Sequence, residues 1–161
     1  MREWSWLPNS QFLEIKQLLA TEERCPIIFG GRYPSHTGNK WMSITKDDVF
    51  QYPCIHSTPK RGIRYMYSKF NDKGHFGVSK VIFGDGGIFN PVIDMEGNYG
   101  MTEHAMAIKV DTLEEATSIG KFIESDTFKK ILRSCSFSLF RIDWNLFTEL
   151  KKDFWKSYAI V

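Results

Sequence analysis

Apolar residues recur with helical spacing near both ends of the chain. The segment NSQFLEIKQLLATEE, residues 9–23, places four large apolar side chains on one helical face and begins with residues that cap helices. The segment DTLEEATSIGKFIES has the same spacing, with Asp111 or Thr112 as its expected cap. The segment DTFKKILRSC repeats the pattern, with Asp126 as its cap. The pattern therefore predicts one N-terminal helix and two C-terminal helices.

The middle of the chain carries short apolar and aromatic runs separated by Gly, Pro, Asn and Asp, which is the pattern of strands and turns. Composition predicts a hairpin turn for NDKGH, residues 71–75. We expect an α+β fold, with a single domain over residues 1–161 and a β-rich, twisted central sheet region flanked by the three helices. The expected strands have the sequences CPIIF, WMSI, YPCIHST, GIRYMYSKF, HFGVSKVIFG, IFNPVID and HAMAIKV.

The composition is that of a globular protein. The 161 residues are 42% hydrophobic, which suffices for one core, and no run of eighteen apolar residues predicts a membrane span. The N-terminal segment lacks the apolar stretch of a signal peptide, so the expected location is the cytoplasm, without membrane partners. Cys25, Cys54 and Cys135 form no CxxC pair, and we expect them to act as small buried apolar residues rather than as zinc ligands.

Positive charge is concentrated in one segment. Residues 24–80 contain ten Lys or Arg against three Asp or Glu, a local balance of +7 in a chain whose net charge is +2. Aromatic residues are interleaved with these cations between residues 56 and 80. Cations can neutralise phosphates and aromatic rings can stack on bases, so this segment favours nucleic acid as the partner.

The glycine-rich segment KVIFGDGGIFNPVIDMEGNYGMTEHA, residues 80–105, matches none of the cofactor motifs that it resembles. It lacks the lysine of a P-loop, and its glycine spacing differs from that of a dinucleotide fingerprint. Asn90-Pro91 is followed by Val-Ile rather than by the Pro-aromatic pair of DNA amino-methyltransferases. We therefore expect no cofactor, no metal and no catalytic residue here, and we interpret the glycines as permitting positive φ and close backbone approach.

The order of several short motifs resembles the C-terminal target-recognition (specificity) region of TaqI-like and fused type II restriction–modification adenine methyltransferases, including relatives in large DNA viruses. The resemblance covers roughly residues 50–155. It rests on the following pieces, in this order: Lys-Val-Ile at 80–82, Asn90-Pro91, Tyr99-Gly100-Met101-Thr102, the strand at 105–108, and Ser134-Cys135 through Arg141-Ile142-Asp143-Trp144.

This resemblance implies a DNA-binding domain that reads a site in double-stranded DNA while a separate methyltransferase or nuclease domain performs the chemistry. It makes Thr102 and His104 candidate DNA contacts. The sequence itself offers further candidates for DNA binding. Those expected to contact phosphates are Lys60, Arg61, Arg64, Lys69 and Lys80; those expected to contact bases are Arg32, His56, Asn71, His75 and His104; Lys40 completes the basic set.

Two alternatives stay open at this point. A small Mg²⁺-dependent nuclease could use Asp85, Asp94, Glu96 and Lys80. An interaction subunit could instead dock on a separate methyltransferase, with no DNA binding of its own.

Overall fold

The computed structural model describes residues 23–29, 40–73, 75–135, 147, 150 and 152–158. Two four-stranded sheets and the helices of this part form an α+β fold, as expected. The first sheet has the order β1-β8-β5-β6 and the second sheet the order β2-β4-β3-β7. The strands are β1 Ile27–Phe29, β2 Met42–Ser43, β3 Tyr52–Ser57, β4 Arg64–Ser68, β5 Lys80–Gly84, β6 Gly87–Asp94, β7 Gly100–Met101 and β8 Ala105–Lys109.

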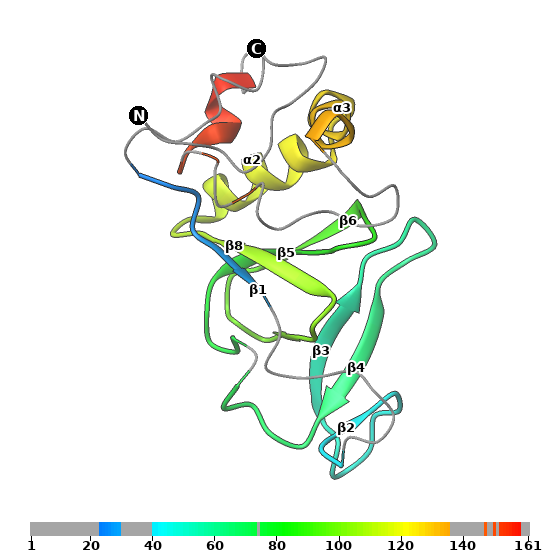
Figure 1. Cartoon of the computed structure of the whole chain (residues 1–161). Coiled ribbons are helices and arrows are strands. Elements are labelled where there is room, and N and C mark those ends of the chain that lie inside the picture. Colours follow the sequence, from blue (N-terminus) through cyan, green and yellow to red (C-terminus); the bar gives the residue numbers. More distant parts are fainter. Residues whose placement is uncertain are drawn as a thin grey trace.

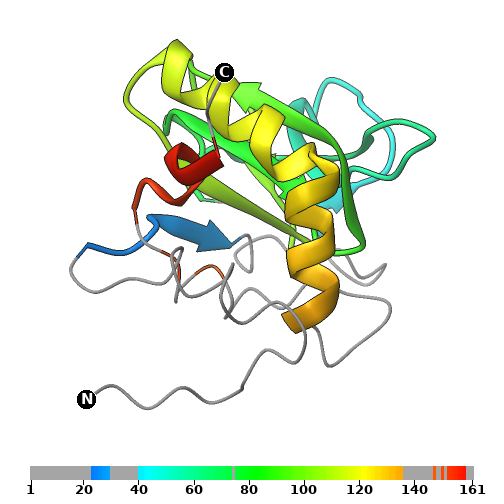
Figure 2. The same ribbon diagram turned by 90° about the horizontal axis from the view of Figure 1, so that it is seen from above.

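The elements form three layers, with the helices above the first sheet and the second sheet below it (Figure 1). The helical layer consists of α2 Leu113–Glu124, α3 Asp126–Cys135 and the short 3₁₀ helix η1 Phe154–Tyr158. Seen from above, α2 crosses the first sheet and α3 continues from it at an angle (Figure 2). None of the helices in the described part of the chain has the length and apolar character that crossing a membrane requires.

The apolar run of β5 is explained by this layering. Val81 and Phe83 belong to the cluster packed against the helices, whereas Ile82 belongs to the cluster facing the second sheet. Successive side chains of a strand point to opposite faces, so a sheet that is covered on both faces needs apolar residues at every position. Cys25 and Cys54 are also buried, as expected, and burial raises the pKa of each thiol to about 12. The side chain of Cys135 lies outside the described residues.

The two long C-terminal helices are confirmed, and their caps are partly as predicted. The backbone N–H of Glu115 donates to the side chain of Thr112, which caps α2. For α3, the cap is Ser125 rather than Asp126, because Ser125 Oγ accepts from the backbone N–H of Phe128 at 3.2 Å. The predicted N-terminal helix lies outside the described residues.

The prediction of a hairpin turn at residues 71–75 is wrong. β4 pairs with β2 and β3, whereas β5 pairs with β6 and β8, so the segment between β4 and β5 crosses from one sheet to the other. The strand expected over residues 75–84 also begins only at Lys80. Turn-forming residues mark a change of direction but do not determine which strands pair.

Candidate nucleic-acid interface

The tip of the β3–β4 hairpin displays two of the predicted cations. The backbone N–H of Gly62 donates to the carbonyl of Pro59 at 3.0 Å, which closes a turn with Lys60 and Arg61 at its two central positions. Both side chains are exposed. Gly62 has φ +132°, a conformation that favours glycine. The turn therefore presents adjacent cations at its corner.

This turn is fastened to the first sheet through its backbone. The backbone N–H of Gly84 donates to Thr58 Oγ1 at 2.9 Å, and Asn90 Nδ2 donates to the carbonyl of Pro59 at 2.6 Å. A Cβ on Gly84 would lie 2.9 Å from the backbone nitrogen of Thr58, so the close approach requires glycine. The glycine-rich segment and its Asn-Pro step thus hold the basic turn in place.

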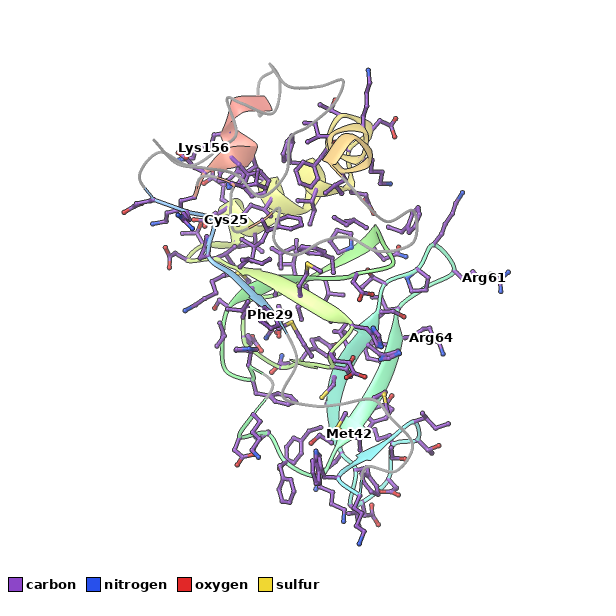
Figure 3. The ribbon with its side chains drawn as sticks, in the orientation of Figure 1. Cys25, Phe29, Met42, Arg61, Arg64 and Lys156 are labelled. Carbon is purple, nitrogen blue, oxygen red and sulfur yellow. The ribbon has the colours of Figure 1, made fainter. Side chains whose placement is uncertain are left out.

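Arg64 adds a third exposed cation at the first residue of β4. It extends from the same side of the molecule as Arg61 (Figure 3). Its positive charge also acts on His56, where it contributes to a lowered pKa. Lys60, Arg61 and Arg64 are hereafter called the basic loop.

Two histidines meet beside the basic loop. The rings of His56 and His104 have centroids 5.3 Å apart and are nearly perpendicular, at 87°. His56 Nδ1 lies 2.9 Å from Thr102 Oγ1, and His104 Nδ1 lies 3.4 Å from Asp85 Oδ2. The backbone N–H of Asp85 also donates to the carbonyl of His104 at 3.0 Å, which joins the β5–β6 turn to this group.

Burial lowers the pKa of His56 most strongly, followed by the charge of His104 and then by that of Arg64. The carboxylates of Asp85 and Glu103 act in the opposite direction. The net effect is a pKa below the ordinary histidine value, which favours neutral His56 at physiological pH.

No known protein family, curated protein sequence or solved structure matches this chain.

The other predicted cations and polar residues lie away from the basic loop. Lys69 follows the opposite end of β4, roughly 15 Å along the strand from Arg64, and its Nζ lies 5.3 Å from the centre of the Phe50 ring. Lys40 and Asn71 are exposed, whereas His75 is half-buried with Nε2 3.3 Å from the carbonyl of Phe29. Arg32 and the residues 141–144 of the resemblance lie outside the described residues.

Lys80 is unavailable for a phosphate contact, which corrects its assignment. Its side chain is 0% exposed, and Nζ donates to Asp94 Oδ2 at 2.9 Å and to the carbonyls of His75 and Val78 at 3.0 and 3.1 Å. Thr102 is buried as well, so it supports His56 rather than reaching DNA directly. The burial of Lys80 could not be predicted from the sequence, because a lysine in a strand normally marks an exposed position.

The four residues of the magnesium-nuclease alternative do not converge. Asp85 lies in the β5–β6 turn, whereas Asp94 ends β6 at the other end of the hairpin, roughly 20 Å away along the strand. Asp94 is paired with buried Lys80, and Glu96 is exposed. Over the described ranges, no group of three or more His, Cys, Asp or Glu side chains is placed to hold a metal ion.

Several residues at this interface were missed by sequence reasoning. Thr58 and Asn90 were not predicted to anchor the basic turn, and Asp85 was considered only as a metal ligand. His56 and His104 stand far apart in sequence and become neighbours only through the pairing of β3 with β7 and of β8 with β5. No local spacing signals such a contact.

Proposed function

We propose that this chain is a DNA-binding target-recognition domain of a restriction–modification system. The observation that carries the proposal is the basic loop. Two exposed cations occupy a turn that hydrogen bonds hold to the first sheet, and a third, Arg64, is exposed at the start of β4. Clustered Lys and Arg side chains bind the phosphates of duplex DNA. Because the turn is held in advance, binding DNA costs little ordering of its backbone.

The neighbourhood of the basic loop supports base reading as well as phosphate binding. His56 and His104 are half-buried beside it, and both can hydrogen-bond a base edge. β3 and β4 are the central strands of the second sheet, and the end of their hairpin, from Ser57 to Arg64, extends past the short strands β2 and β7. A projecting two-stranded β-ribbon can enter the major groove of DNA, where each base pair presents a distinct pattern of donors and acceptors. In this proposal, the basic loop positions the ribbon on the phosphates and the histidines face the bases.

The test is binding of labelled duplex DNA at two salt concentrations, with and without Mg²⁺. Replacing Arg61 and Arg64 together by Ala should weaken binding and reduce the salt dependence of log K by about one for each lost phosphate contact. The matched control is the double replacement of Lys109 and Lys121 by Ala, which removes the same charge from exposed positions on β8 and α2. Equal effects of the two double variants would show that the basic loop has no special role.

Catalysis is assigned in this proposal to a separate methyltransferase or nuclease domain. Binding to DNA without cleavage, in Mg²⁺ as well as without it, is the expected result for this chain. Cleavage that depends on Mg²⁺ would contradict the assignment.

A docking subunit is the second candidate, and exposed apolar side chains at the far end of the second sheet favour it. Ile44 is 80% exposed and Val49 is 53% exposed. Such side chains are frequent at protein interfaces when they form a patch. This function predicts no salt-sensitive DNA binding by the isolated chain, so the same measurement separates the two candidates.

A further inference from the structure

Three separate segments bring one small polar group of four residues to the side of the basic loop. His56 comes from β3 and Asp85 from the β5–β6 turn, while Thr102 and His104 come from the connection between β7 and β8. The perpendicular rings of the two histidines are 5.3 Å apart between centroids. Each ring uses Nδ1 for a contact within the protein, so a ligand would meet Nε2. In His104 this atom also lies 3.7 Å from Glu103 Oε1.

The hydrogen bond to Thr102 determines where His56 carries its proton. The Thr102 hydroxyl is buried, and it accepts from the backbone N–H of His104 at 3.4 Å. Its own proton has one acceptor among the hydrogen bonds of the described residues, namely His56 Nδ1 at 2.9 Å. A buried hydroxyl donates wherever an acceptor is present. Neutral His56 therefore carries its proton on Nε2 and acts as a donor, and its lowered pKa agrees with this form.

Asp85 determines the proton position of His104 in a different way. A carboxylate only accepts, so Nδ1–H of His104 donates to Asp85 Oδ2. Nε2 then accepts a hydrogen bond when the ring is neutral and donates one when the ring is protonated. Oε1 of the exposed Glu103 carboxylate lies 3.7 Å from this Nε2.

We propose that His56 and His104 together read the major-groove edge of a purine, with His56 donating to N7 and His104 distinguishing adenine from guanine. N7 is an acceptor in both purines, whereas the neighbouring group is an N6–H₂ donor in adenine and an O6 acceptor in guanine. Neutral His104 accepts from adenine, and protonated His104 donates to guanine. This inference rests on the proposed DNA-binding function and deepens it by naming the base class.

The charged groups around His56 favour its neutral form. Burial lowers its pKa most, the charges of His104 and Arg64 lower it further, and Asp85 and Glu103 act in the opposite direction. His56 resists protonation further, because its Nδ1 would have to become a donor and the buried Thr102 hydroxyl would lose its acceptor. His56 therefore keeps its Nε2–H donor.

The experiment selects preferred sites for the full chain from duplexes with a randomised centre. Each purine of the selected duplex is then replaced by its 7-deaza analogue, which lacks the N7 acceptor. The replacement at the purine that is read should weaken binding by about 5-fold or more. In His56→Ala the same replacement should have no further effect, because the donor is already absent. His56→Gln retains an N–H donor and should regain part of the sensitivity.

The native chain should prefer one of the two purines at this position, and His104→Ala should reduce that preference. Thermal unfolding of each variant confirms that it remains folded. Salt-sensitive binding without sensitivity to 7-deazapurines, or an unchanged preference between adenine and guanine in His104→Ala, would overturn the purine reading and leave DNA binding intact. No binding of any duplex by the native chain would overturn the proposed function and the purine reading together.

Discussion

Replacing Asp94 by Asn should strongly destabilise the protein, because it unbalances a buried ion pair. Asp94 Oδ2 accepts from Lys80 Nζ at 2.9 Å and from the backbone N–H of Tyr99 at 3.0 Å, and Oδ1 accepts from the backbone N–H of Asn98 at 2.8 Å. Asparagine has nearly the same shape but only one acceptor oxygen. Whichever way its amide is oriented, an N–H₂ group faces another donor.

The expected magnitude follows from the burial of Lys80, whose side chain is 0% exposed. Removing one partner of a buried ion pair costs about 3–5 kcal/mol. For a chain of this length, each kcal/mol lowers the melting temperature by about 2–4 °C, so the variant should melt about 6–20 °C below the native protein. Such a loss is a large share of the typical stability of a domain, about 5–15 kcal/mol.

The assay is urea unfolding followed by circular dichroism, where the midpoint should fall without a change in the m-value. Glu96→Gln is the matched control, because Glu96 is exposed and two residues away; it should stay within about 0.5 kcal/mol of the native protein. An Asp94→Asn variant as stable as this control would refute the role given to the ion pair.

The deficit of Asp94→Asn should also shrink as pH rises from 7 towards 10. Burial lowers the pKa of Lys80, and the carboxylate of Asp94 counteracts this effect in the native protein. Without the carboxylate, the folded-state pKa falls further below the unfolded value of about 10.4. Between these two pKa values the unfolded chain binds more protons, so the free energy of unfolding of the variant rises with pH. A deficit that is constant with pH would contradict this explanation.

Two further substitutions test the backbone conformation at Gly97 and the electrostatics around His56. Gly97→Ala should lower the melting temperature markedly, because Gly97 has φ +70° and an added Cβ would clash with Cα of Gly77. Gly86→Ala is the control, because an added Cβ there would have no atom within 4 Å. Equal melting temperatures of the two variants would contradict this explanation. Arg64→Ala should raise the pKa of His56 measured by NMR titration, because the cation at Arg64 lowers it; an unchanged or lower pKa would show that the two side chains are not coupled.

Features that depend on residues close in sequence, such as helices, were predictable. The wrong predictions concern contacts between residues far apart in sequence. The spacing of apolar residues located α2 and α3. The hairpin at residues 71–75 was wrong because local turn chemistry carries no information about strand partners. Lys80 was misassigned because its charge suggested exposure, whereas Asp94 on the paired strand neutralises it in the interior.

The same distinction between local and distant contacts applies to the candidate interface. The clustering of Lys60, Arg61 and Arg64 is visible in the sequence, since the three residues lie within five positions of one another. The meeting of His56 with His104 requires the second sheet to be assembled, and Thr102 acquires its role only when buried beside it. The spacing of apolar residues in the sequence cannot predict a cluster of side chains that come from several different strands.

The alternation of the chain between its two sheets has a consequence for how this fold can be modified. The chain contributes β1 to the first sheet, β2 to β4 to the second, β5 and β6 to the first, β7 to the second, and β8 to the first again. Because β7 pairs in parallel with β3, the second sheet includes a strand that follows β5 and β6 in the chain. Neither sheet is a continuous segment that could be exchanged between proteins by recombination. If the chain binds DNA as proposed, new specificity would arise by substitution of side chains on the same scaffold, because a transplanted hairpin would lack the strands that hold it.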